Sequence, residues 1–457
     1  MANKDSSSQT AMKIPFNSPA RKRLLAALAL LFAALYLGLA AREFVASWLG
    51  GRTELTSLKA AAWLDPGNAE YRNHLGRYYD LVMRDPIAAI SHYKTAVQLN
   101  PYSADFWFDL AGAYQVLADS TNQTLALERA IQAEPTRPDV AWTAANFYLV
   151  QGDNDKALRE FRVVMAYDPS LAASAIAFCW RINPDVDLLL RDAVPPAADA
   201  ELAFLALLQK DVGLLLGKAV SPAPDTDVAS LTRQIKMETA STFKVWNALI
   251  ETHQPFEERY AYDYIRFLLQ FKEIDQAVLV WQQTAARFGH SSYLPSASNL
   301  VVNSTFSLAV LNNGFDWQYE KQSGVDLKFD DSVAHAGNRS LRITFDGPGI
   351  NEAGIFQFIP VQPGTTYDFS AYYKDEKDEE LKGAGGPHFT IQDMFSPAIL
   401  YESDELRDAE SWRRAEGEFT TSPDCRLVKL LIRRLPAGSP IRGKLWVDDF
   451  HIVRKPS

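Results

Sequence analysis

Four short sequences close successive helix-like segments of this chain: WLDP at residues 63–66, QLNP at 98–101, QAEP at 132–135 and AYDP at 166–169. Their prolines follow one another at spacings of 35, 34 and 34 residues. Because proline lacks an amide N–H and restricts the residue before it, each sequence is a helix stop. A period of this length indicates repeated helical pairs.

Between these stops, small and aromatic residues recur at matching places. Gly76, Ala111 and Ala145 lie on the first helix expected in successive pairs, and each is followed three residues later by a tyrosine. A small residue lets the two helices of a pair approach closely, and the aromatic ring fills the space beside it. We therefore assign these rings to a buried core rather than to ligand contact.

With this period, these stops and this placement of small residues, the chain resembles the tetratricopeptide repeat (TPR) family. The resemblance is clearest over residues 69–169 and degenerate over 170–252, and a final helical pair ends at Gly289. It implies an all-α, TPR-like solenoid over residues 53–289. Stacked helical pairs present an extended concave surface, which implies a protein partner.

A charge-free apolar run, Leu24 to Ala41, directly follows three basic residues. At 1.5 Å per residue it is about 27 Å long, which predicts a single transmembrane helix at 24–41. The positive-inside rule predicts that residues 1–23 form a cytoplasmic tail and that the bulk of the chain is periplasmic or otherwise extracytoplasmic. The alternative is a cleaved signal peptide with a small-x-small site at 38–40, but the run is longer than a usual signal core.

Composition excludes one class of partner. The net charge is −10, and no basic stripe is present that would suit nucleic acid. The two cysteines, Cys179 and Cys425, fall in different predicted domains, so the sequence supports neither a disulfide framework nor a cysteine metal site. An exported protein without disulfides suits bacteria, and we expect the bacterial inner (cytoplasmic) membrane as its location.

After a polar linker at residues 290–298, the pattern changes to period-two alternation. Eight short strands over this region predict an all-β antiparallel sandwich, specifically a jelly roll. The predicted strands are VDLKFDD at 325–331, SLRITF at 340–345, GIFQFIPV at 354–361, YDFSAYYK at 367–374, HFTIQDM at 388–394, RRAEGEFTT at 413–421, RLVKLLIRR at 426–434 and KLWVDDFHIV at 444–453.

Turn and core sequences in the predicted domain at 299–457 occur in an order that resembles bacterial carbohydrate-binding modules with the galactose-binding-like jelly-roll fold. They include NGFDW at 313–317, VQPGTTY at 361–367 and WVDDF at 446–450. The resemblance implies a sugar held by stacked aromatic rings and by polar side chains. For each ring the alternative is a core or rim position. The implied carbohydrate-binding candidates are Trp317, Tyr319, Tyr372, Tyr373, Phe389, Gln392, Asp393 and Tyr401.

Asp448 and Asp449 resemble the paired acids that help to hold a structural calcium ion in some related jelly rolls. Oxygen ligands suit calcium, but the remaining ligands are not evident, so a solvated turn is the alternative. We expect no other cofactor. The sequence has no phosphate-binding loop, His-Glu-x-x-His motif, nucleophile elbow or Cys/His cluster, and it therefore predicts a protein that is not an enzyme.

Together these features predict a membrane-tethered, non-enzymatic scaffold that binds a protein through its repeats and a polysaccharide through its sandwich. Such a protein would serve bacterial polysaccharide assembly or export. Two alternatives stay open: a purely protein–protein assembly factor of the cell envelope with a structural sandwich, and an adaptor for a separate carbohydrate-active enzyme. An exposed aromatic platform would favour a sugar, and a flat polar face would favour protein contact.

Overall fold

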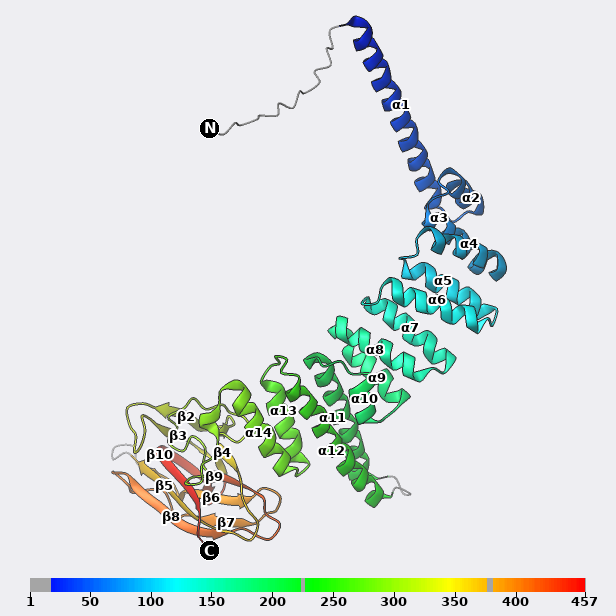
Figure 1. Ribbon diagram of the computed structural model, residues 1–457. Helices are drawn as coiled ribbons and strands as arrows, with labels where there is room; N and C mark the ends of the chain where they lie inside the picture. Colours follow the sequence, from blue (N-terminus) through cyan, green and yellow to red (C-terminus); the bar gives the residue numbers. More distant parts are fainter. Residues whose placement is uncertain (1–17, 223–226, 376–380, 457) are drawn as a thin grey trace, which may run out of the picture. The chain divides into compact units, whose positions relative to one another are not determined.

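The computed structural model describes residues 18–222, 227–375 and 381–456 (Figure 1). Most of the predicted tail, residues 1–17, lies outside the described residues. The chain divides into two compact units, Met1–Pro195 and Pro196–Ser457. This division falls inside the predicted helical domain and not at the predicted linker, so the last helices belong with the β-sandwich.

The described part of the first unit is helical. Its elements are α1 (Pro19–Gly50), α2 (Leu55–Leu64), α3 (Ala69–Arg77), a π-helical turn (Tyr78–Val82), α4 (Pro86–Leu99), α5 (Ala104–Val116), α6 (Ser120–Ala133), α7 (Pro138–Gln151), α8 (Asn154–Tyr167), a 3₁₀ turn (Pro169–Leu171), α9 (Ala172–Ile182) and α10 (Val186–Asp192).

The four predicted helix stops are confirmed. Helices α2, α4, α6 and α8 each end two residues before the proline of their stop sequence. Polar side chains cap four helices at their N-termini. Asn68 accepts a hydrogen bond from the N–H of Glu70 at the start of α3, and Asp85, Asp119 and Asp153 accept from backbone N–H groups at the starts of α4, α6 and α8. This regular alternation of helices is consistent with a solenoid.

The small residues allow close helix packing, as their placement predicted. A Cβ atom added to Gly76 on α3 would lie 2.5 Å from the ring of Tyr93 on α4. Tyr93 is buried, and so are Ala111 on α5 and Ala145 on α7. Any larger side chain at position 76 would therefore push α3 and α4 apart.

Helix α1 contains the predicted membrane segment and continues beyond it to Gly50. In the described part of the chain, α1 is the single helix that is long and apolar enough to cross a membrane, and none of its most apolar 18-residue window is buried. A signal sequence near the N-terminus has the same properties. Both interpretations of the sequence therefore stay open.

The second unit begins with four helices and a 3₁₀ turn: α11 (Ala198–Val220), α12 (Val228–Glu251), α13 (Arg259–Gln270), α14 (Ile274–Phe288) and η3 (Ser291–Tyr293). Helices α13 and α14 are the predicted final pair. Ten strands follow: β1 (Gln318–Tyr319), β2 (Val325–Asp330), β3 (Ser340–Gly349), β4 (Glu352–Pro360), β5 (Thr366–Asp375), β6 (Gly386–Asp393), β7 (Ile399–Glu402), β8 (Arg413–Thr420), β9 (Leu427–Leu435) and β10 (Pro440–Arg454).

The strands form an antiparallel β-sandwich, which confirms the predicted all-β class of this region. The first sheet has the order β1-β4-β9-β6-β7 and the second has the order β2-β3-β10-β5-β8. We call them sheet 1 and sheet 2. All eight predicted strands are present. The two strands that the sequence analysis missed, β1 and β7, are edge strands of two and four residues, which are too short to show alternation.

One side of each sheet builds the common core. Sheet 1 contributes Ile355, Phe389 and Leu430, and sheet 2 contributes Phe369 and Val447. Because successive side chains of a strand point to opposite faces, the intervening residues lie on the two outer faces of the sandwich. The outer faces are therefore the surfaces that these strands offer to a ligand.

Helix α14 is joined to the sandwich by the buried side chain of Trp281. The indole N–H donates to the carbonyl oxygen of Tyr293 (3.1 Å), and the hydroxyl of Tyr293 donates to the carbonyl oxygen of Ala309 (2.6 Å). The ring also meets Phe315 edge-on, and a Cβ atom at Gly314 would lie 2.2 Å from it. The segment predicted as a polar linker is therefore packed in place by Tyr293.

This packing predicts that Gly314→Ala destabilises the second unit. Gly314 has φ +61°, and Gly364 has φ +59° but no atom within 4 Å of an added Cβ. Both alanine variants carry the strain of a left-handed backbone, but only Gly314→Ala also meets Trp281, which we expect to cost about 1–3 kcal/mol more. Thermal unfolding followed by calorimetry measures the difference in melting temperature.

The Trp281→Ala background is the control for this contact. Without the indole ring, Gly314→Ala should lower the melting temperature no further than Gly364→Ala does. Equal melting temperatures for the two glycine variants in the wild-type background would show that Trp281 does not confine this position.

Candidate functional site

The outer face of sheet 1 has an apolar floor beneath charged side chains. Phe356 and Phe358 alternate with core residues on β4, and their rings lie 5.2 Å apart. In register with them on β9 are Leu431, opposite Phe356, and Lys429, opposite Phe358. The ammonium group of Lys429 lies 4.3 Å from the centroid of the Phe356 ring, a cation–π arrangement.

Ion pairs cross this floor between neighbouring strands. Lys429 lies 3.7 Å from Glu352 on β4, and Arg433 lies 3.8 Å from Glu402 on β7. All four side chains are partly exposed. Such pairs contribute little to stability, so their donors and acceptors are available to another polar ligand.

Strand β6, on the other side of β9, presents His388, Thr390 and Gln392 on the same face. Thr390 lies between Leu431 and Glu402 in the sheet register. Its hydroxyl is buried and has no hydrogen-bond partner within the described part of the chain. Phe356, Leu431 and Thr390 are buried on this face, and Phe358 is half-buried. We call the side chains of Phe356, Phe358, Lys429, Arg433, Gln392 and their neighbours Thr390, Leu431, Glu352, Glu402 and His388 the sheet 1 face.

The outer face of sheet 2 carries a cluster of rings. His335, from the loop between β2 and β3, stacks on Tyr372 of β5 with ring centroids 3.6 Å apart, and Trp412 meets His335 edge-on. One imidazole nitrogen of His335 lies 3.0 Å from a carboxylate oxygen of Asp449. The loop thus covers one face of the Tyr372 ring.

Asp330 and Trp446 anchor the neighbouring part of sheet 2. The indole N–H of Trp446 donates to Asp330 (3.1 Å), and the hydroxyl of Ser332 donates to the same carboxylate (2.6 Å). The hydrogen bonds from Ser332 and Trp446 lower the pKa of Asp330 to about 2. This carboxylate therefore stays ionised at neutral pH and holds the start of the loop that follows β2.

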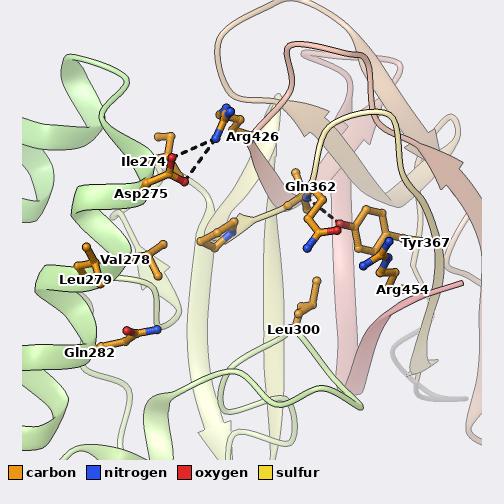
Figure 2. A pocket seen from close by; sticks show the side chains of 12 residues that line it. Ile274, Asp275, Val278, Leu279, Gln282, Leu300, Gln362, Tyr367, Arg426 and Arg454 are labelled. Carbon is orange, nitrogen blue, oxygen red and sulfur yellow. Dashed lines mark hydrogen bonds and ion pairs between the residues drawn. The ribbon is translucent and has the colours of Figure 1, made fainter. Parts of the chain in front are cut away.

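A groove of about 500 Å³ lies between α14 and one end of the sandwich (Figure 2). Its walls are mainly apolar, with Val278 and Leu279 on α14 facing Leu300. The guanidinium of Arg426 pairs with Asp275 across it (3.1 Å). The one aromatic ring in its lining, Tyr367, is 1% exposed, so the groove offers no ring face for stacking.

One family model matches part of this chain. The model of a family described as "Carbohydrate binding domain" matches residues 298–433. The comparison with curated proteins found no match. The matched residues include nine of the ten strands, β1 to β9 in whole or in part, and after this family model we call the domain the CBM4-like sandwich.

Solved structures are similar at low identity. One described as "CBM4 structure and function" is 16% identical, covering 34% of this chain and 99% of that chain, with a TM-score of 0.27. The CBM22-1 xylan-binding domain from Paenibacillus barcinonensis Xyn10C is also 16% identical, covering 34% and 93%, with a TM-score of 0.25. A crystal structure of MamA is 24% identical, covering 34% and 86%, with a TM-score of 0.26.

Three predicted ligand-contact residues lie in the core of the CBM4-like sandwich. Trp317, Tyr373 and Phe389 are 1%, 4% and 0% exposed. The indole N–H of Trp317 also donates to the carbonyl oxygen of Asn303. These rings cannot stack on a sugar while they fill the core. The prediction that they contact a ligand is therefore wrong, because they are buried.

Two further candidates serve mainly to hold the CBM4-like sandwich together. The carboxylate of Asp393 accepts hydrogen bonds from the N–H of Phe395 and the hydroxyl of Ser396, which fixes the turn after β6. Tyr401 packs against Phe369, and a Cβ atom at Gly417 would lie 2.4 Å from its ring. Both side chains are therefore engaged in packing or turn formation.

The other three candidates reach the surface. Gln392 lies on the sheet 1 face, and Tyr319 is 43% exposed on the edge strand β1 of the same sheet. Tyr372 lies on the opposite side of the sandwich, beneath His335. Of these three surface residues, the structure brings Gln392 and Tyr319 to one sheet and leaves Tyr372 on the other.

The sequence analysis missed Phe358, Lys429 and Arg433 of the sheet 1 face. A signal for them exists in the alternation of RLVKLLIRR, in which Lys429 and Arg433 mark the outer side and Leu430 and Ile432 the inner side. The same alternation in GIFQFIPV places Phe356 and Phe358 together. What one strand alone does not show is which strands lie beside it.

Asp448 of the predicted calcium pair is fully buried and holds backbone in place. Its carboxylate accepts hydrogen bonds from the N–H groups of His335, Ala336 and Asp449, at 2.7, 3.0 and 2.7 Å. Burial raises the pKa of Asp448 above its ordinary value. Asp449 pairs instead with His335 and His451.

Both acids of the predicted calcium pair already have partners in this structure. Residues 18–222, 227–375 and 381–456 hold no group of three or more His, Cys, Asp or Glu side chains that could bind a metal ion. A cation would have to compete with the three N–H donors for the carboxylate oxygens of Asp448.

We expect that EDTA leaves the melting temperature of the full chain unchanged, whereas Asp448→Asn lowers it. The carboxylate of Asp448 accepts hydrogen bonds from backbone N–H groups, and the NH₂ group of asparagine would place a donor against them. We expect this to lower the free energy of unfolding by about 1–3 kcal/mol. Calorimetry with and without EDTA measures both effects, and Asp424→Asn at an exposed position is the matched control. A melting temperature that falls with EDTA and recovers with Ca²⁺ would restore the calcium hypothesis.

Proposed function

We propose that the CBM4-like sandwich binds a polysaccharide through its sheet 1 face. The observation that carries this proposal is the half-buried ring of Phe358, which packs beside the buried Phe356 and lies among charged and amide side chains on one outer face. A pyranose ring presents an apolar face to an aromatic ring and hydroxyl groups at its edge. Lys429, Arg433 and Gln392 offer donors, and Glu352 and Glu402 offer acceptors for those hydroxyls.

Two properties favour the sheet 1 face over the ring cluster of sheet 2. Its apolar floor is covered by side chains held in exposed ion pairs, which can exchange partners at little cost. On sheet 2, His335 occupies a face of the Tyr372 ring, and the backbone N–H groups of His335 and Ala336 bond to Asp448. That loop would have to leave its anchors before a sugar could stack on Tyr372.

For the whole chain we propose a membrane-tethered, non-enzymatic scaffold. Helix α1 would anchor it in the bacterial inner membrane, with the N-terminus cytoplasmic and the bulk periplasmic. The regular helix pairs would act as a TPR-like solenoid that binds a protein partner. A tethered sugar-binding module raises the local concentration of polysaccharide near that partner, which suits polysaccharide assembly or export.

The test is binding of the detergent-solubilised full chain to a panel of bacterial and plant polysaccharides by affinity electrophoresis or calorimetry. Phe358→Ala removes a ring of the proposed floor, and Gln392→Ala removes an amide at its edge. Loss of one stacking ring should weaken binding about fivefold, since such contacts are worth about 1 kcal/mol. Tyr372→Ala on sheet 2 is the matched control and should bind as the wild type does.

Other outcomes are equally informative. Weaker binding in Tyr372→Ala alone would move the site to sheet 2. No saturable binding by the folded chain to any polysaccharide would contradict the glycan proposal and favour a sandwich that serves protein contact. Circular dichroism of each variant shows that the chain is folded.

A further inference from the structure

An apolar surface lies beside the C-terminal end of α1. Leu81, Val82 and Met83 are consecutive, and their side chains are 73%, 62% and 55% exposed. Trp48 on the last turns of α1 is 56% exposed, and the guanidinium of Arg52 lies 3.9 Å from the centroid of its ring. We call these five residues the juxtahelical patch. Soluble proteins seldom leave so many large apolar side chains exposed together.

The two parts of the patch meet at a cavity of about 300 Å³. Leu81 and Val82 line it from the π-helical turn, and Gly50 and Arg52 line it from the end of α1. The patch therefore joins the helix end to the first helical pairs of the same compact unit.

Packing fixes this patch relative to α1. Helix α1 continues without a break from the apolar run to Gly50 (Figure 1). Ala46 is buried with Leu58 and Tyr71 in one cluster, and a Cβ atom at Gly50 would lie 2.3 Å from the Tyr71 ring. If α1 is inserted in a membrane, the juxtahelical patch is therefore held at a fixed depth relative to the bilayer.

That depth matches the headgroup layer of a bilayer. Trp48 is seven residues beyond Ala41, the end of the charge-free run, which is about 10 Å along the helix. Side chains on a helix point back toward its N-terminus, so the Trp48 ring reaches toward the bilayer. The headgroup region extends several ångströms beyond the hydrocarbon core, and tryptophan is enriched there.

We infer that the juxtahelical patch rests in the lipid headgroup layer and holds the first helical pairs against the membrane surface. This inference rests on the proposed insertion of α1. The exposed side chains Phe44 and Val45 continue the apolar surface of α1 toward Trp48, and this continuity favours lipid over a protein partner. Arg52 beside Trp48 supplies a cation that suits lipid phosphate.

The experiment uses the full chain reconstituted into phosphatidylcholine–phosphatidylglycerol vesicles. Val82→Cys carries an environment-sensitive fluorophore, and Leu81→Cys serves as a second labelling site. Val150→Cys, which is 71% exposed at the end of α7, is the matched control. Labelling of the wild-type chain gives the background from the buried Cys179 and Cys425.

We expect the probe at position 82 to shift to shorter emission wavelength on reconstitution and to be quenched by headgroup-labelled spin lipids. The probe at position 150 should show neither change. A probe at 82 that is quenched no more than the one at 150 would overturn the inference. Blue-shifted emission without quenching would also overturn it, because a protein surface would then cover the patch.

Carbonate extraction separates this inference from the proposed anchor. If the vesicles retain the chain and the probe at 82 reports water, the anchor stands and the inference fails. If carbonate releases the chain, membrane insertion of α1 fails, and the inference fails with it.

Discussion

A glycine set directly against an aromatic ring is the contact on which both compact units depend. In the first unit, Gly50 lies against Tyr71 and Gly76 against Tyr93. In the second, Gly314 lies against Trp281 and Gly417 against Tyr401. At each place a side chain on the glycine would overlap the ring. The absence of a Cβ atom therefore sets the spacing between helices, between helix and sandwich, and between β7 and β8.

The packing of aromatic rings in the core explains why some of the predicted carbohydrate-binding residues are buried and others reach the surface. The sandwich is rich in aromatic residues. Trp317, Tyr373 and Phe389 are buried in its core, and Tyr401 packs against Gly417. Residue type does not distinguish a ring that fills a core from one that meets a ligand. What distinguishes them is the face of the strand and the neighbours on adjacent strands, and the sheet order supplies both.

Local features were the most predictable from the sequence. The four proline stops fix helix ends to within two residues, because proline acts on its own neighbours. Alternation located eight strands for the same reason. The sheet 1 face was not predictable, because Phe358 and Lys429 become neighbours only through the pairing of β4 with β9. The buried role of Asp448 was also hidden, because its partners His335 and Ala336 are more than a hundred residues away.

The contact between Trp281 and the sandwich bears on how such a protein can evolve. Carbohydrate-binding modules are readily imagined as cassettes that recombine at their linkers. In this protein, a break at residue 298 would separate Gly314 and Phe315 from the indole of Trp281, which packs against both residues. The segment that must be transferred together is therefore larger than the β-sandwich. A gene fusion that kept the sandwich intact would also have to include α14.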